Sequence, residues 1–170
     1  HRPLKDEQWR VRLVVGGDRL AYIADSGSPA TDITETKLLL NSIISDAMHG
    51  ARFATMDLKD MFLHTIMVDP EYMKVPYKYF PEDIRTQYNL KDLVHDGYIY
   101  IKIKKGMYGL KQAAILAYRQ VSTLLKKAGY LPIIGSMGMW KHTERKTLFS
   151  LCVDDFGIKY YAKEDVLHLE

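Results

Sequence analysis

Two neighbouring acidic residues interrupt a stretch that otherwise has the composition of a β-strand. In "SLCVDDFGIKYY", residues 150–161, an apolar run leads into Asp154 and Asp155, and a second apolar run begins at Phe156. A hairpin turn is the simplest explanation, because Asp is a favoured turn residue and two-residue turns connect antiparallel strands. Two adjacent carboxylates are also suited to metal binding, provided that a further ligand lies elsewhere in the chain.

A third carboxylate stands in a similar context in "FATMDLKDMF", residues 53–62. An apolar run ends at Asp57, and Asp60 follows one helical turn later. The simpler explanation is that Asp57 caps the segment that follows the strand. If the strands that end at Asp57 and Asp154 are instead central strands that pair with each other, three carboxylates converge at one edge of a sheet.

Three carboxylates in one partly buried site repel each other, and divalent cations that prefer oxygen ligands relieve this repulsion. Mg²⁺ typically takes one or two carboxylates together with substrate phosphates. Two such ions about 3.5–4 Å apart stabilise the attacking and leaving oxygens of a phosphoryl transfer. Asp57, Asp154 and Asp155 therefore predict a metal site of this kind, without indicating a particular enzyme.

Apolar periodicity predicts the helices and strands that would position these acids. A capping box of Asp32 and Glu35 begins one helix, which Gly50 ends, and Gly129 follows another. The predicted strands are 9–15, 52–57, 98–103, 147–153 and 156–161, and the predicted helices are 33–48, 111–128 and a short surface helix within 81–97. This order predicts the α+β class, with an antiparallel sheet packed on helices.

The composition is that of a single globular domain. The chain has 170 residues, of which 47% are hydrophobic and 26% charged, and its net charge of +3 permits nucleic-acid binding without indicating it. Residues 1–20 are too charged for a signal peptide, and no apolar run is as long as a membrane span. The single cysteine, Cys152, excludes an internal disulfide and a thiolate zinc cage. We therefore expect an intracellular protein, either cytoplasmic and particle-associated or nuclear.

Three ordered motifs resemble a known family. "MDLKDMF", "KGMYGLKQA" and "CVDD" are similar to the core motifs of the reverse transcriptase palm, and most similar to those of copia-type LTR retrotransposons. "WRVRLVV" resembles the fingers strand that precedes them, and "EYMKVP" resembles the segment after the first motif. The resemblance implies that residues 1–170 are one fingers–palm domain that stops before a thumb and an RNase H domain. The implied activity is that of an RNA-directed DNA polymerase from a retrotransposon polyprotein.

The resemblance also implies roles for individual residues. Asp57 and Asp154 would bind both of two Mg²⁺ ions, for which Mn²⁺ can substitute, and Asp155 would complete the acidic cluster. Phe62 would be the steric gate, because an aromatic ring under the sugar of the incoming nucleotide leaves no room for a 2′-hydroxyl. The backbone around Asp60 and Met61 would meet the triphosphate.

Further nucleotide contacts are implied at Gln112, which would lie against the nucleotide and the template, and at Arg10. A planar cation such as Arg10 suits neutralisation of a triphosphate, but Arg12 shares its strand face, so the choice between them stays open. The motifs depart from the usual family pattern at three positions, none of which removes a metal ligand. Cys152 replaces a usual Tyr, Ala114 a usual Pro, and Met61 a common Ala.

The implied partners are an RNA or DNA template with its primer and deoxynucleoside triphosphates, with no membrane. Self-association and further polyprotein domains stay open. One alternative is an inactive retroelement remnant that serves as a nucleic-acid-binding or scaffolding module. A weaker alternative is an aspartic protease that uses Asp25-Ser26-Gly27, although the residues that follow are helical by period. Lys102, Lys104 and Lys105 form a basic strand edge, for which a solvated face is the simpler interpretation.

Overall fold

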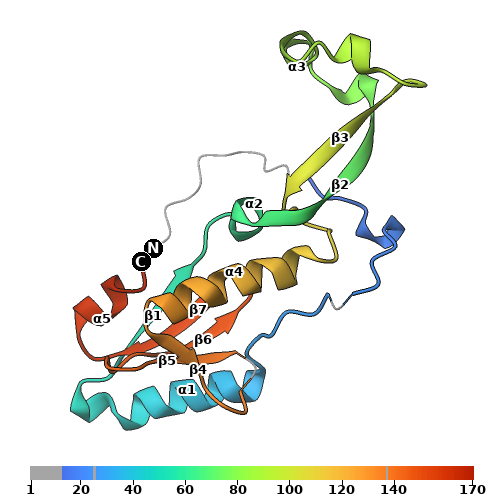
Figure 1. The fold of residues 1–170 in the computed structure, drawn as a ribbon. Coiled ribbons are helices and arrows are strands. Elements are labelled where there is room, and N and C mark those ends of the chain that lie inside the picture. Colours follow the sequence, from blue (N-terminus) through green and yellow to red (C-terminus); the bar gives the residue numbers. More distant parts are fainter. Residues whose placement is uncertain (1–12, 25, 137) are drawn as a thin grey trace.

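The fold consists of a body and a projecting arm (Figure 1). It is known from a computed structural model, which describes residues 13–24, 26–136 and 138–170. The body contains a five-stranded antiparallel sheet in the order β1-β7-β6-β5-β4, and the arm is a two-stranded antiparallel sheet of β2 and β3. The predicted α+β class with antiparallel sheets is therefore confirmed.

The elements of the body and the arm follow each other along the chain. The body strands are β1 (Arg52–Asp57), β4 (Tyr130–Pro132), β5 (Met139–His142), β6 (Leu148–Cys152) and β7 (Asp155–Tyr160). The arm holds β2 (Ile66–Pro76), β3 (Tyr98–Lys105) and, between them, helix α3 (Glu82–Gln87). The remaining α-helices are α1 (Ile33–Ser45), α2 (Met61–His64), α4 (Ala113–Lys127) and α5 (Lys163–Leu167).

Helix α1 begins where its capping box predicts. The Asp32 carboxylate accepts a hydrogen bond from the Glu35 N–H at 2.7 Å, and the Asp32 N–H donates to the Glu35 carboxylate at 3.2 Å. These two bonds satisfy N–H groups that the first turn of a helix leaves without intrahelical partners. The helix ends at Ser45, somewhat before the predicted position, and a 3₁₀ turn (Ala47–His49) follows.

Helices α4 and α1 cover opposite faces of the body sheet (Figure 1). On the α4 face, Leu125 packs into a buried cluster with aromatic and aliphatic side chains of four strands: Tyr130, Trp140, Phe149, Leu151, Phe156 and Ile158. On the α1 face, Leu39 and Ile43 pack against Met139. Each fully buried side chain of this size contributes about 1.5–3 kcal/mol. Burial on both faces therefore holds β6, a central strand, firmly in register.

Several features of the sheets differ from the sequence-based expectation. The expected central strand β1 is instead the edge strand of the body sheet, next to β7. The strand predicted at 98–103 extends to Lys105 and pairs with β2 in the arm, outside the body sheet. Strands β4 and β5 have no strong periodic signal in the sequence. Of the strand predicted at 9–15, residues 9–12 lie outside the described residues, and 13–15 form no strand.

The segment that leads into α4 packs closely against residues 15–17. The Val15 N–H donates to the Tyr108 carbonyl at 2.8 Å. Gly109 has φ 92°, a conformation that disfavours a side chain, and a Cβ atom there would overlap the Val15 carbonyl oxygen. Gly17 faces it equally closely, since its own Cβ would overlap the Gly109 carbonyl. The second glycine of "KGMYGLKQA" is therefore required by a backbone-to-backbone contact.

Candidate functional site

The three predicted acids lie at one end of the body sheet. Asp57, the last residue of β1, is directly opposite Asp155, the first residue of β7. Asp154 is in the two-residue turn between β6 and β7, and its carbonyl accepts a hydrogen bond from the Leu58 N–H at 2.8 Å. Directly opposite residues of an antiparallel pair have Cα atoms about 4.5–5.5 Å apart and side chains on the same face. The fold therefore brings Asp57 to the same end of the sheet as Asp154 and Asp155, which are far from it in the sequence.

The acidic cluster is open to water. Asp57 and Asp155 are exposed, and Asp154 is partly buried. Across the described ranges, no three His, Cys, Asp or Glu side chains are arranged so as to hold a metal ion. Carboxylate oxygens at a solvent-accessible sheet end are nevertheless the ligand type that Mg²⁺ and Mn²⁺ prefer. The chemistry of the donor set fits such an ion, and its binding here stays a prediction.

The turn that carries Asp154 has a strained backbone. Val153, its first residue, has φ 59°. A β-branched residue with positive φ is a conformational outlier, and such a residue persists only where the surrounding structure determines it. Here the β6–β7 ladder and the bond from Leu58 hold the turn on two sides. Backbone strain of this kind is found mainly at functional sites, so the strained turn supports a functional site at this end of the sheet.

The residues after Asp57 form a tight turn and then α2. Asp60 has φ 55° and precedes the helix, and the Met61 N–H donates to the Leu58 carbonyl at 3.3 Å. Met61 is buried. Phe62 is half-buried, and its ring meets that of Tyr108 edge-on with centroids 5.1 Å apart. The first motif therefore packs directly against the second.

Gln112 lies at the N-terminus of α4 and is buried, with only 5% of its surface exposed. Its Nε2 donates a hydrogen bond of 2.7 Å to Oε1 of Glu71 in β2. Its Oε1 is buried and has no hydrogen-bond partner among the described residues. Glu71 is not among the predicted site residues, although it begins "EYMKVP". Arg10, Arg12 and Asp25 lie outside the described residues.

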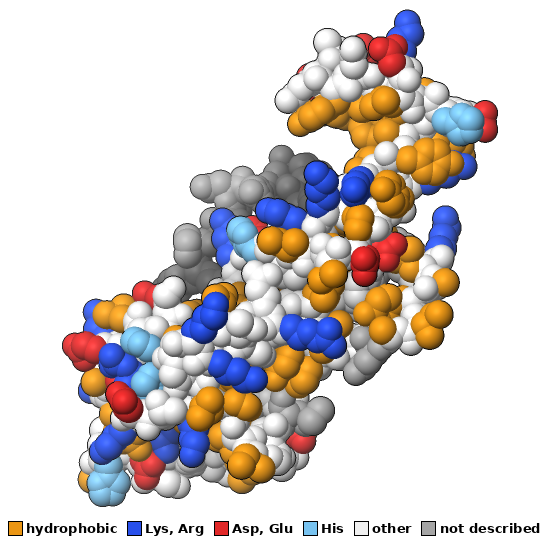
Figure 2. Space-filling model, viewed as in Figure 1, with side chains coloured by type: hydrophobic (Ala, Val, Ile, Leu, Met, Phe, Trp, Pro, Cys, Tyr) orange, Lys and Arg blue, Asp and Glu red, His pale blue; other side chains and the backbone are white. Residues whose placement is uncertain are grey.

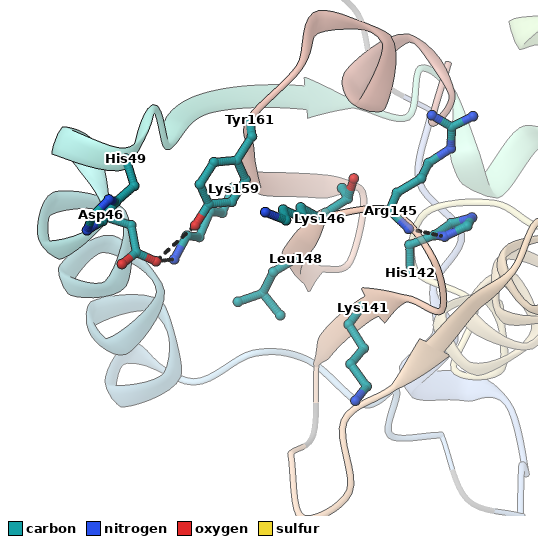
Figure 3. Close-up of a pocket in the computed structure, with 10 residues that line it drawn as sticks. Asp46, His49, Lys141, His142, Arg145, Lys146, Leu148, Lys159 and Tyr161 are labelled. Atoms are coloured by element: carbon teal, nitrogen blue, oxygen red, sulfur yellow. Dashed lines mark hydrogen bonds and ion pairs between the residues drawn. The ribbon is translucent and has the colours of Figure 1, made fainter.

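A cavity of about 630 Å³ lies near the opposite end of β7 from the acids, and no sequence motif points to it (Figure 3). Asp46, after α1, accepts hydrogen bonds from Lys159 at 2.6 Å and from the Tyr161 hydroxyl at 2.9 Å. These bonds, the one from Lys159 first, lower the pKa of Asp46. Lys159 also donates to the Ser42 carbonyl at 3.0 Å, so this cluster attaches the end of α1 to β7.

The comparison with protein-family models agrees with the motif resemblance to reverse transcriptases. The family model described as "Reverse transcriptase (RNA-dependent DNA polymerase)" matches residues 1–166. Neither the curated proteins nor the solved structures include a match. Within the part of the chain that the structure describes, no helix is long and apolar enough to cross a membrane. Since the match covers nearly the whole chain and the acids of its motifs share one sheet end, this chain belongs to the reverse transcriptase family.

Proposed function

We propose that this chain is the fingers and palm of an RNA-directed DNA polymerase from a copia-type retrotransposon. It would transfer nucleotides from deoxynucleoside triphosphates to the 3′-end of a primer paired with an RNA or DNA template. The observation that carries the proposal is the register of β1 and β7, which sets Asp57 opposite Asp155 beside the turn that holds Asp154. Membership of the reverse transcriptase family supports it independently.

The acids would form the catalytic centre. Asp57 and Asp154 would ligate both of two Mg²⁺ ions, with Mn²⁺ as a substitute, and Asp155 would complete the cluster. When bound, the ions supply Lewis-acid stabilisation of the oxygens that attack and leave during phosphoryl transfer. The chain itself contributes the position of the carboxylates, because the strained turn at Val153 and the Leu58–Asp154 hydrogen bond restrict where they can lie.

The neighbouring residues would orient the nucleotide. The Phe62 ring, which meets the Tyr108 ring edge-on, would lie under the sugar and exclude a 2′-hydroxyl. The backbone around Asp60 and Met61 would meet the triphosphate, which Arg10 or Arg12 would neutralise. Gln112 would lie against the nucleotide and the template, and its Oε1 has no hydrogen-bond partner among the described residues.

A second candidate function is nucleic-acid binding without catalysis, as in an inactive retroelement remnant. The observation that favours it is an exposed arm face that carries tyrosines and lysines. We do not propose an aspartic protease, because that site needs an Asp-Ser-Gly loop between strands. Ser26 and Gly27 instead precede helix α1, with no strand in the described residues between them.

Primer extension by Asp57→Asn and Asp154→Asn variants tests the proposed centre. Either change removes a ligand charge, so extension should fall by at least about a thousandfold while the fold stays intact. The double variant should be no worse than either single variant, because residues that act as one unit are not additive. Asp96→Asn, a change at an exposed acid in the arm, is the matched control and should extend primers normally. Near-normal extension by Asp154→Asn, beside an active unmodified chain, would refute the assignment.

A further inference from the structure

The two faces of the arm differ in chemistry. In the β2–β3 register, Tyr72 is opposite Lys102, Lys74 is opposite Tyr100, and Pro76 is opposite Tyr98. Opposite residues share a face, and alternate residues along a strand share it too. These six residues therefore form one face, which we call the Tyr–Lys face. The other face carries the aliphatic residues Met73, Val75, Ile99, Ile101 and Ile103.

Most of the Tyr–Lys face is open to solvent, whereas the aliphatic face is buried or half-buried. Ile99 and Ile103 are only 4% and 5% exposed, but Tyr72 and Tyr100 are 61% and 53% exposed. The space-filling view shows hydrophobic and basic side chains close together on the arm (Figure 2). Large aromatic side chains are usually buried in a core or an interface. Two that lie open on one sheet face therefore indicate a binding surface.

The cations of this face are placed among the rings. The Lys74 Nζ lies 4.0 Å from the centroid of the Tyr98 ring and 6.0 Å from that of Tyr100. Lys102 lies opposite Tyr72, and the described residues supply no ion-pair partner to Lys74 or Lys102. None of the six positions of the face is acidic. The face is thus both aromatic and positively charged.

We propose that the Tyr–Lys face binds a single strand of nucleic acid. Bases would stack on the rings of Tyr72 and Tyr100, and Lys74 and Lys102 would pair with the phosphates. Every base has a π-face, so open aromatic rings beside cations suit a single strand of any sequence. A duplex is a poorer fit, because its bases are already stacked on each other and inaccessible to the rings.

The position of the arm suggests which strand is bound. Only a tight turn, helix α2 and Thr65 separate Asp57 from the start of β2, so the arm leaves the body at the acidic end of the sheet. A strand that follows the Tyr–Lys face toward the base of the arm would therefore lead to the proposed catalytic centre, as the unpaired template must. This assignment to the template rests on the proposed function, but the binding itself requires no catalysis.

Fluorescence anisotropy of the whole chain with labelled oligothymidine and oligouridine, each about 12 nucleotides long, tests the inference. We expect Tyr72→Ala/Tyr100→Ala to bind at least about tenfold more weakly, because each lost stack weakens binding about 5- to 150-fold. Tyr72→Phe/Tyr100→Phe keeps both rings and should bind like the unmodified chain. Lys102→Gln should reduce the slope of log affinity against log salt by about 0.7.

The matched control is Tyr79→Ala/Tyr88→Ala, which removes two exposed tyrosines of the arm that lie outside the Tyr–Lys face. Equal affinities of this control and the Tyr72→Ala/Tyr100→Ala variant would refute the proposal, as would an unchanged salt slope for Lys102→Gln. No strand binding by the unmodified chain would also refute it and leave a protein as the partner of the face. If the unmodified chain binds the strand through its tyrosines but does not extend primers, the proposed function is wrong and the proposed binding surface still holds.

Discussion

Phe62 has a proposed role, the exclusion of a 2′-hydroxyl, that can be tested separately from its packing in the fold. Its ring is half-buried and meets Tyr108 edge-on. If it excludes the 2′-hydroxyl, Phe62→Val should raise the use of ribonucleotides relative to deoxynucleotides by about tenfold or more, the scale on which a single fitted group discriminates substrates. Competition between the two nucleotides in primer extension measures this ratio.

Tyr108→Leu is the matched control for Phe62, because it removes the same ring contact from the other side. It should leave the ratio of ribonucleotide to deoxynucleotide use unchanged. A ratio that stays constant in Phe62→Val, with deoxynucleotide use intact, would mean that Phe62 is only a packing residue.

Asp46 is the residue whose titration should change the stability of the fold. The hydrogen bonds from Lys159 and Tyr161 lower its pKa below the ordinary value of 3.8. A group whose pKa is lower in the folded state stabilises the fold above its unfolded pKa, and this stabilisation is lost as pH falls through the folded pKa. Asp46→Asn should therefore lower the Tm at neutral pH, and the difference from the unmodified chain should shrink below pH 3.8.

Thermal unfolding of both proteins from neutral pH to about pH 3 measures this effect. In a Lys159→Met background, Asp46→Asn should lower the Tm by less, because the charged one of the two donors to the carboxylate is already gone. A Tm difference that stays the same over the whole pH range would exclude the linkage.

At the level of elements, residues 15–17 pack closely against the Gly109 segment, which connects β3 of the arm to α4. Gly109→Ala adds a Cβ atom that overlaps the Val15 carbonyl and that also disfavours φ 92°. We expect a loss of at least about 2 kcal/mol in the free energy of unfolding, measured by urea denaturation.

Gly97→Ala distinguishes the effect of backbone strain from that of steric overlap. Gly97 has φ 79°, but no heavy atom lies within 4 Å of the added Cβ position. It should cost only about 1 kcal/mol, the scale of backbone strain alone. Equal losses in the two variants would show that the close contact contributes nothing.

At the level of the whole molecule, the arm and the body differ in how their strands are supported. β6 has a neighbour on both sides and buried residues on both faces, whereas β2 and β3 form a sheet of two strands with one open face. Two-stranded sheets are marginally stable. We therefore expect amide hydrogens of β2 and β3 to exchange faster than those of β6, by about tenfold or more.

Hydrogen exchange followed by mass spectrometry resolves these segments. Because Ile103 and Met67 pack in a cluster with Ala113 of α4, the base of the arm should exchange more slowly than its outer end. Protection of β3 equal to that of β6 would mean that the arm and the body unfold as one unit.

The sequence by itself determined the features that depend on neighbouring residues. The capping box of Asp32 and Glu35 predicts the start of α1, and apolar runs predict β1 and the β6–β7 hairpin with its acids. The order of the three motifs also indicates the family, which the family match confirms. These signals are readable because a cap, a turn or a strand forms through contacts a few residues apart.

Only the tertiary structure decided which strands pair and which polar groups meet. β1 is an edge strand, β3 belongs to the arm, and Gln112 is held by Glu71. Strand pairing depends on which apolar faces bury each other. Periodicity in the sequence shows that a strand has an apolar face, but it does not show which strand will be its neighbour. For the same reason the Tyr–Lys face exists only because the register of β2 and β3 sets its tyrosines and lysines side by side.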